Sequence, residues 1–198
     1  MEKRNLEKVF TSIFHEKLSF RDFVEFDIKK NYEVFKNNNR YIYSTSKELK
    51  SIHKFINSSI LSYATYNKEV VYSYRKGVSI RDAVERHSGS KYFLQTDISK
   101  NNVKSTLISQ KDKFPILDVE NYIDLLVYLT VVDDKLPAGF STSPLLSNLC
   151  LFEFDTTLLK FAIKNKLVYT RYSDDIIISS TEAKIDSEVL SFIENCLS

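Results

Sequence analysis

One segment of this 198-residue chain, residues 169–179, restricts both what the chain can fold into and what it can do. The segment reads Tyr-Thr-Arg-Tyr-Ser-Asp-Asp-Ile-Ile-Ile-Ser, so strand-favouring residues flank two adjacent acids, and a β-hairpin with Asp174 and Asp175 at its tip is predicted. In a tight turn both acids can project to the same side, and their charges then converge. Two close carboxylates repel each other unless a cation lies between them, and their oxygens are ligands that Mg²⁺ and Mn²⁺ favour. The hairpin is therefore a candidate metal site that needs a third ligand.

A purely structural role for the acidic pair is the alternative. Asp is common in turns because its side chain bonds to nearby backbone, and the same dipeptide occurs as Asp133-Asp134, which is expected to form an ordinary turn just past a helix. Asp97 changes the balance, because it lies at the far end of an apolar strand predicted over residues 91–99. A lone acid is costly to bury there without a cationic partner. Asp97 is the predicted third metal ligand.

Composition indicates a globular protein without other metal chemistry. The chain is 43% hydrophobic, which is enough for one domain with a real core, with or without a small appendage. Cys150 and Cys196 are far apart and the three histidines stand singly, so neither zinc nor a disulfide framework is indicated, and a reducing cytoplasm is the expected setting. The charged N-terminus is unlike a signal peptide, and the longest nearly apolar run, residues 123–132, is too short to span a bilayer. No membrane partner is expected.

The charge distribution is uneven although the net charge is only +2. Residues 1–100 carry 19 Lys and Arg against 12 Asp and Glu, whereas residues 101–198 carry 9 against 14. A basic first half and an acidic second half are expected if one part contacts phosphates and another binds cations. Lysine-rich solvated surfaces are the alternative explanation.

Apolar periodicity and turn residues predict a mixed α and β chain without repeats or low-complexity linkers. The three glycines all fall in predicted turns, so no glycine-rich phosphate loop is available. Ser46, Ser79 and Ser143 are predicted to begin helices. Helices are expected at residues 5–16, 20–26, 47–64, 80–87, 119–132, 144–164 and 186–197, and strands at residues 32–36, 40–44, 70–77, 91–99 and on both sides of the acidic pair.

Several short motifs occur in a defined order between about residue 32 and residue 180. They are Arg40-Tyr41-Ile42-Tyr43 with Lys47-Glu48-Leu49-Lys50, Tyr74-Arg75-Lys76-Gly77, the strand Phe93 to Ser99, Leu136-Pro137-Ala138-Gly139 followed by Ser143-Pro144 and Ser147-Asn148, and Tyr172-Ser173-Asp174-Asp175. In order and spacing they resemble the fingers, first carboxylate strand, nucleotide-binding loop and Tyr-x-Asp-Asp signature of bacterial reverse transcriptases of the retron type and of related phage-defence polymerases. The resemblance covers roughly three quarters of the chain.

This resemblance implies an α+β right-hand polymerase with fingers and palm, in which an antiparallel palm sheet is backed by helices and the thumb is absent. N-terminal helices and fingers would occupy about residues 1–90, and an incomplete palm residues 91–198. Asp97, Asp174 and Asp175 would be the catalytic metal ligands for two Mg²⁺ ions, with Mn²⁺ as an alternative. Further residues are implied in nucleotide binding (Lys36, Arg40, Asn102, Ala138 and Gly139) and in nucleic-acid binding (Lys47, Lys50, Tyr74, Arg75 and Lys76).

The chain departs from the family pattern in three ways. Ala138 replaces the usual Gln before the loop glycine, and Asn102 stands where an aromatic residue usually walls the sugar pocket. The chain also ends before the later palm and the thumb, which implies a fragment or a protein completed by a partner chain. The implied activity is RNA-dependent DNA polymerisation in anti-phage defence, with an RNA template that could be the enzyme's own structured non-coding RNA, nucleotide triphosphates and a DNA product. A template-independent nucleotidyltransferase and a non-catalytic RNA-binding derivative are the alternatives.

Overall fold

The computed structural model describes residues 3–15, 17–38, 40–97, 102–182, 185 and 187–197. The chain forms two compact units, each built from two separate stretches of chain. Unit 1 comprises Met1–Thr65 and Asn102–Ser147, and unit 2 comprises Tyr66–Asn101 and Asn148–Ser198. This division interleaves the two halves of the chain, whereas the fingers and palm expected from the sequence meet near residue 90. Because a compact unit is not the same as a functional subdomain, the fingers and palm boundary stays a prediction.

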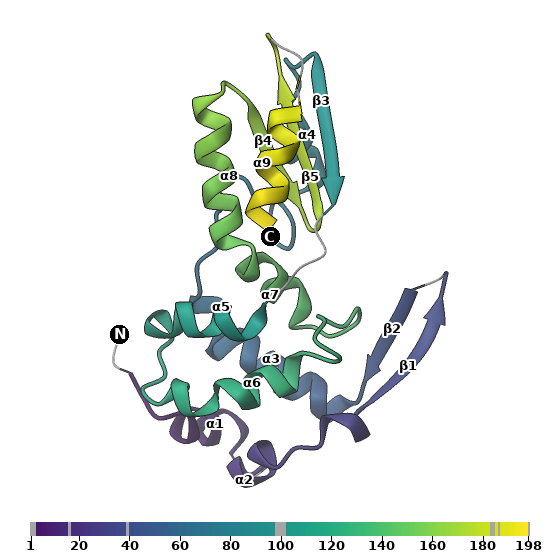
Figure 1. Ribbon diagram of the computed structural model, residues 1–198. Coiled ribbons are helices and arrows are strands. Elements are labelled where there is room, and N and C mark those ends of the chain that lie inside the picture. The colour runs from purple at the N-terminus through teal and green to yellow at the C-terminus, as the bar shows by residue number, and fades with distance from the viewer. Residues whose placement is uncertain are drawn as a thin grey trace. The chain divides into compact units, whose positions relative to one another are not determined.

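Unit 1 combines a group of helices with a two-stranded antiparallel sheet (Figure 1). Ser46 caps the third helix as predicted, because its hydroxyl oxygen accepts a hydrogen bond from the Leu49 amide at 3.0 Å. The helices are α1 (Leu6–Phe14), α2 (Phe20–Val24), α3 (Lys47–Ser59), α5 (Val103–Gln110), α6 (Ile123–Thr130) and the start of α7 (Ser143–Cys150), and the strands are β1 (Tyr32–Asn37) and β2 (Arg40–Thr45).

Aromatic rings join the N-terminal helices of unit 1 to α3. Phe10 of α1 is fully buried, stacks on Phe23 of α2 with 4.6 Å between ring centroids, and meets the edge of Phe55 of α3 at 5.1 Å. These distances are favourable for aromatic pairs, and burying one such side chain stabilises a fold by about 1.5–3 kcal/mol. Packing is thus what α1 and α2 contribute to the unit.

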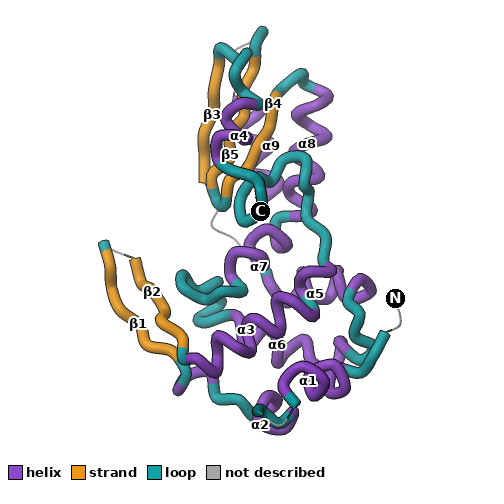
Figure 2. The backbone as a smooth tube through the Cα atoms, turned by 180° about the vertical axis from the view of Figure 1, so that it is seen from behind, coloured by secondary structure: helices purple, strands orange, loops and turns teal. Residues whose placement is uncertain are grey.

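The β1–β2 hairpin projects from the helices of unit 1 in both views (Figures 1 and 2). The predicted pairing is confirmed, with Asn37 opposite Arg40 and Lys36 opposite Tyr41. Asn38 in the connecting turn has a φ of 44°, a left-handed conformation that Asn tolerates better than most residues. Apart from Thr45 at the base, the side chains of both strands are exposed or only half-buried, so the ribbon is not part of a core.

Unit 2 is a three-stranded antiparallel sheet in the order β3-β5-β4, packed against helices (Figure 2). Two buried isoleucines of the central strand, Ile176 and Ile178, belong to the same core as Leu158 of α8 and Ile193 of α9, so α8 and α9 cover that face. Its elements are α4 (Ile80–Glu85), β3 (Tyr92–Asp97), α8 (Phe152–Lys164), β4 (Val168–Tyr172), β5 (Asp175–Ser180) and α9 (Ser187–Leu197). The expected fold class of helices with antiparallel sheet is confirmed at this level.

The strand predicted over residues 70–77 is wrong. The described segment forms only an isolated parallel bridge between Val71 and Arg171 of β4, where the Arg171 amide donates to the Val70 carbonyl at 2.7 Å. Beyond it the chain turns away, because Tyr74 adopts a left-handed φ of 56° that no strand can contain. The apolar start of the segment, Val70 and Val71, is nevertheless buried in the core of unit 2.

The single helix predicted over residues 144–164 is wrong as well, since α7 ends at Cys150 and α8 begins at Phe152. Leu151 between them has φ −97° and ψ 10°, outside the helical region, and its side chain is buried. Periodicity could not reveal this break because apolar residues continue on both sides of it. Helix α5 was not predicted, because its buried positions include the polar Thr106 and Gln110. In the described part of the chain, no helix is both long enough and apolar enough to cross a membrane.

A buried histidine lies in the helical part of unit 1. His53 of α3 is fully buried, its Nε2 lies 2.8 Å from the Leu129 carbonyl oxygen, and its ring packs beside Phe140. A carbonyl can only accept, so Nε2 carries the proton, and Nδ1 has no hydrogen-bond partner among the described atoms. Burial lowers the pKa of the His53 imidazole, and the Leu129 carbonyl only partly offsets this effect.

We expect the protein to become less stable as the pH falls from 7.5 to 5. The pKa of His53 is lower in the folded state than its unfolded value of about 6.5, so the stability held by the neutral ring is present above that pH and is lost below it. The loss is at most about 1.4 kcal/mol per pH unit for one histidine. Urea unfolding at both pH values measures it, and His53→Leu should show a smaller difference between the two. If His53→Leu lost as much stability between pH 7.5 and pH 5 as the unaltered protein, His53 would not be the cause of the loss.

Candidate active site

The acidic hairpin of unit 2 has a two-residue tip, and only one of the two acids occupies it. Tyr172, the last residue of β4, pairs with Asp175, the first residue of β5, so the tip consists of Ser173 and Asp174. The prediction that both acids lie at the tip is therefore corrected for Asp175. Ser173 has a φ of 60°, as the first central position of hairpin turn types I′ and II′ requires. Glycine usually occupies such a position, so the neighbours of Ser173 must hold it there.

The sheet register brings the two predicted acidic segments together. Asp97, the last residue of β3, lies directly opposite Asp175 in the antiparallel pairing of β3 with β5. Asp175 is half-buried and accepts a hydrogen bond from Nε2 of Gln95 at 3.4 Å, whereas Asp174 is exposed. The Asp97 side chain and residues 98–101 lie outside the described residues. Like charges at directly opposed positions destabilise a sheet, so an acid pair in this register calls for a cation.

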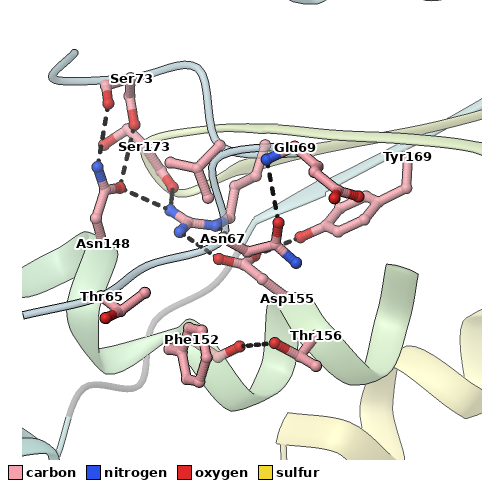
Figure 3. A network of polar contacts seen from close by, with 12 residues as sticks. Thr65, Asn67, Glu69, Ser73, Asn148, Phe152, Asp155, Thr156, Tyr169 and Ser173 are labelled. Carbon is pink, nitrogen blue, oxygen red and sulfur yellow. Dashed lines mark hydrogen bonds and ion pairs between the residues drawn. The ribbon is translucent and has the colours of Figure 1, made fainter. Parts of the chain in front are cut away.

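A buried polar network is centred on Arg171 of β4 and Asp155 of α8, which are both fully buried. Figure 3 shows Asp155, Tyr169, Asn148 and Ser173 of this network. The guanidinium binds Asp155 in a fork, with Nε 2.8 Å from Oδ1 and Nη2 2.7 Å from Oδ2. The Tyr169 hydroxyl donates to the same carboxylate at 2.6 Å. Burial and the neighbouring Asp155 raise the pKa of Tyr169, which keeps its hydroxyl protonated as a donor.

The segment before α4 contacts the hairpin tip from its exposed side. The Tyr74 hydroxyl lies 2.8 Å from the Ser173 hydroxyl. Arg75 points elsewhere, because its Nη1 donates to the backbone carbonyls of Lys68 at 2.7 Å and Val71 at 2.6 Å. Arg75 thus holds its own loop, and Lys76 is exposed.

A cavity of about 620 Å³ lies in unit 1 between the β1–β2 hairpin and the loop that follows α6. Arg40 and Ala138, both predicted as nucleotide-binding residues, line it, whereas Lys36, Asn102 and Gly139 do not. Aromatic, apolar and charged side chains share the wall with them (Val34, Tyr41, Tyr43, Val132, Asp133, Lys135, Leu136 and Pro137). The cavity therefore combines two positive charges (Arg40 and Lys135) and one negative charge (Asp133) with aromatic and apolar surface.

The loop at the cavity edge is held against β2 through its backbone. The Tyr43 amide donates to the Ala138 carbonyl at 2.8 Å. Gly139 has a φ of 109°, and a Cβ added there would lie 2.3 Å from the Tyr43 carbonyl oxygen, so only glycine fits this approach. Ser143, predicted as the N-cap of the next helix, is instead its first residue, and its hydroxyl donates to the Pro137 carbonyl at 2.8 Å.

Asp133 and Asp134 form the ordinary turn predicted just past a helix. Both have positive φ, at 48° and 57°, and the flanking residues Val132 and Lys135 exchange two backbone hydrogen bonds of 3.0 Å. This is the geometry of a type I′ turn, which Asp tolerates. Asp133 also lines the cavity of unit 1.

Comparison with known proteins decides the family. Residues 28–198 match the family model described as reverse transcriptase (RNA-dependent DNA polymerase). The chain belongs to the reverse transcriptase family. The resemblance found in the motifs is thereby confirmed.

Among the relatives of this reverse transcriptase chain are retron enzymes of Escherichia coli. It is 33% identical to retron Ec48 reverse transcriptase over 115 residues, which cover 57% of this chain and 28% of that protein. It is 27% identical to retron Ec83 reverse transcriptase over 157 residues (74% and 50%) and 29% identical to retron Ec73 reverse transcriptase over 168 residues (71% and 49%). The chain thus spans half or less of the length of these curated relatives.

Reverse transcriptases generally use divalent metal ions, and the acids at the hairpin fit such ions. Within the described part of the chain, Asp174 and Asp175 form no ion pair with Lys, Arg or His. The described side chains contain no group of three or more His, Cys, Asp and Glu that could hold a metal, but the side chain of Asp97 is not among them. Unpaired carboxylates at the end of a sheet provide the hard oxygen ligands that such ions prefer.

The remaining predicted residues of this reverse transcriptase chain all lie in unit 1. Lys36, Lys47 and Lys50 are exposed in unit 1. Asn102 caps α5, where its Oδ1 accepts a hydrogen bond from the Ser105 amide at 3.0 Å. A sugar-contacting role for Asn102 would compete with this cap, and that role stays a prediction.

The sequence analysis missed Arg171, Asp155 and Asn148, which are all fully buried. Arg171 and Asp155 carried a detectable signal, because a charged residue within an apolar strand or helix must find a partner when it is buried. Asn148 appeared only as part of the Ser147-Asn148 motif, with no role of its own. Arg171 lies in the predicted strand before the acidic pair, and Asp155 lies between Phe154 and Leu158 of the predicted helix. The spacing of Arg171 and Asp155 in the sequence could not show that they bind each other.

Proposed function

We propose that this chain supplies the fingers and palm of an RNA-dependent DNA polymerase that adds deoxynucleotides to a primer 3′-hydroxyl. One observation carries the proposal: in a chain of the reverse transcriptase family, the register of β3 with β5 opposes Asp97 and Asp175 beside the exposed Asp174. Carboxylates assembled in this way serve phosphoryl transfer on two divalent ions. The name of the family and those of the retron relatives support the same reaction.

In this proposal Asp97 and Asp174 hold two Mg²⁺ ions, for which Mn²⁺ can substitute, and Asp175 adds charge and weaker ligation. When bound, such ions activate the primer 3′-hydroxyl and stabilise the charge on the leaving pyrophosphate. The hairpin contributes a fixed direction for the Asp174 carboxylate, because a two-residue turn between paired strands has little conformational freedom. No general-base histidine is needed.

The cavity of unit 1 is the proposed site for the incoming triphosphate. Arg40 lines it, and a guanidinium fork matches phosphate oxygens. Lys36, opposite Tyr41 on the hairpin, would add a second positive charge, and the Ala138-Gly139 loop would contact the nucleotide. Lys47, Lys50, Tyr74, Arg75 and Lys76 are the proposed contacts to template and primer.

The template, the partners and the biological role are further parts of the proposal. An RNA template is implied by the family. A structured non-coding RNA of the enzyme's own as the source of that template, and anti-phage defence as the role, stay predictions from the motif resemblance. The chain spans half or less of the length of those relatives, and a partner chain that supplies a thumb stays a prediction. Template-independent nucleotide addition is the second candidate, favoured by Ala138, whose methyl group cannot contact the nucleotide as the usual Gln amide does.

Primer extension with the full protein tests the proposal. The assay uses a DNA primer on an RNA template with Mg²⁺ and all four deoxynucleotides, beside reactions without template and without divalent ion. We expect template-directed DNA that requires the metal. Equal incorporation without template would favour the second candidate. No incorporation with Mg²⁺, or with Mn²⁺ in its place, would overturn both.

We expect ribonucleotides to be measurable substrates, although deoxynucleotides are preferred. An aromatic wall excludes the 2′-hydroxyl by collision, whereas an Asn side chain is smaller and can hydrogen-bond to it. A lost collision of this kind changes discrimination by about 10–200-fold. Comparing kcat/KM for each nucleotide and its ribo counterpart measures the effect, and Asn102→Phe should restore selectivity.

The Asn102→Phe change also removes the cap of α5, which costs about 1 kcal/mol. Asn102→Asp is the matched control, because it keeps a capping oxygen and adds no bulk. Strong exclusion of ribonucleotides by the unaltered protein would show that Asn102 is not the residue that selects the sugar.

A further inference from the structure

The Arg171–Asp155 ion pair does more than neutralise two buried charges. Nε and Nη2 of Arg171 satisfy both oxygens of Asp155. The remaining nitrogen, Nη1, donates to the backbone carbonyl of Ser173 at 2.6 Å and to Oδ1 of Asn148 at 3.2 Å. One guanidinium thus ties the hairpin tip to α7 and α8.

Asn148 is itself held in place. Its Nδ2 donates to the Ser73 carbonyl at 3.1 Å, and its Oδ1 accepts from the Ser73 hydroxyl at 3.3 Å (Figure 3). Asn148 and Ser73 are both fully buried, so no water competes for these groups. Asn148, the side chain that orients Nη1, is therefore itself fixed by two hydrogen bonds.

Ser173, the residue that receives this contact, immediately precedes Asp174 and has the left-handed φ of 60°. A non-glycine residue in that conformation persists only where its surroundings hold it. Its carbonyl is bound from the buried side by Arg171, and its hydroxyl lies 2.8 Å from that of Tyr74 on the exposed side. The carbonyl and the hydroxyl of Ser173 are thus both hydrogen-bonded.

Stability alone does not account for a buried ion pair at this place. Replacing such a pair by apolar residues of similar volume is often neutral or stabilising, because taking two charges out of water costs as much as their attraction returns. What apolar residues cannot reproduce is the hydrogen bond from Nη1 to the Ser173 carbonyl. Mutation of a residue that orients a metal ligand commonly lowers metal affinity or activity by about 10–100-fold.

We propose that Arg171 is a positioning residue of the active site: held by Asp155 and Asn148, it fixes the backbone of Ser173 and thereby the direction in which Asp174 presents its carboxylate to a divalent ion. This inference rests on the proposed function, in which Asp174 is a metal ligand. Arg171 touches neither substrate nor metal in this proposal and acts through the turn.

The inference is tested by comparing the unaltered full protein with variants in which the Arg171–Asp155 ion pair is removed or weakened. The double variant Arg171→Met with Asp155→Leu removes both charges together, and Arg171→Lys keeps the charge but cannot bind Asp155 and Ser173 at once. Thermal unfolding reports the fold, electron paramagnetic resonance titration reports Mn²⁺ binding, and primer extension across Mg²⁺ concentrations reports activity. We expect the double variant to fold but to melt below the unaltered protein, because the buried Tyr169 hydroxyl loses its acceptor. We also expect it to bind Mn²⁺ about 10–100-fold more weakly and to need more Mg²⁺ for half-maximal rate.

Tyr169→Phe is the matched control, because it removes a hydrogen bond to Asp155 and leaves the contact of Arg171 with Ser173. We expect a lower melting temperature with Mn²⁺ affinity unchanged within about twofold, as for a contact that supports only the fold. If Tyr169→Phe weakened Mn²⁺ binding as much as Arg171→Lys, the network would be structural and the inference overturned.

Unchanged Mn²⁺ affinity and activity in a folded double variant would also overturn the inference, and so would an absence of Mn²⁺ binding by the unaltered protein. If the double variant does not fold, Arg171→Lys decides, because normal Mn²⁺ binding there contradicts positioning. Failure of the proposed polymerase function would give a different result from failure of this inference. An unaltered protein that binds Mn²⁺ but incorporates no nucleotide would contradict the polymerase, and the Mn²⁺ titrations would still decide the role of Arg171.

Discussion

Replacing Asp174 with Asn is expected to reduce nucleotide incorporation by about a thousandfold or more, because it removes a charged metal ligand worth several kcal/mol in the transition state. Asp97→Asn should have the same effect. Asp174 is exposed at the hairpin tip, so the amide needs no repacking, and the melting temperature should stay within about 3 °C. Single-turnover primer extension with excess enzyme measures the loss without interference from product release.

Asp134→Asn is the matched control for this prediction. It is the same chemical change at an exposed turn position with a φ of 57°, which Asn adopts readily, so activity should be unchanged. Asp133 would be a poorer control because it lines the cavity of unit 1. Near-normal incorporation by Asp174→Asn and Asp97→Asn would remove the basis for assigning the acids to the metal site.

Gly139→Ala is expected to have the largest effect of the three Gly→Ala changes that this chain allows. The new Cβ would lie 2.3 Å from the Tyr43 carbonyl oxygen, and alanine is strained at a φ of 109°. We expect the loop to leave β2, the free energy of unfolding to fall by about 2–4 kcal/mol, and KM for nucleotides to rise. Urea unfolding and steady-state kinetics measure the two effects.

The other glycines separate the two causes. Gly77 has a φ of 75° but open space around its Cβ position, so Gly77→Ala carries the backbone strain without the collision and should cost about 1–2 kcal/mol. Gly89→Ala has neither problem and should be close to neutral. If all three variants lost equal stability, close packing of the loop on β2 would not be the reason for Gly139.

Local features of the fold could be predicted because they depend on neighbours in sequence. The alternation and turn residues on both sides of the acidic pair predicted β4 and β5, the Asn-rich turn predicted the β1–β2 hairpin, and Ser46 predicted the start of α3. Each rests on backbone preferences within a few residues. The same locality explains the errors: an apolar run did not show that residues 70–77 form one bridge, or that a single residue, Leu151, separates α7 from α8.

The candidate site divides in the same way. The residue types and their order pointed to the reverse transcriptase family, which the family match confirms, and they predicted Asp97, Asp174 and Asp175 as its metal ligands. The pairing that sets Asp97 opposite Asp175 joins residues far apart in sequence. A shift of that register by one residue would move every side chain of β3 to the other face, and only packing of the whole sheet against α8 and α9 excludes it.

By itself, then, the sequence determined the family, the acidic hairpin and most of the helices and strands, since these follow from local preferences and side-chain chemistry. Only the tertiary structure decided that Arg171 meets Asp155 and the Ser173 carbonyl, and that Gly139 lies against Tyr43. Such contacts join segments separated by tens of residues. They form because buried charges and close-packed backbones must find complementary partners, and no pattern within one segment records which partner packing will supply.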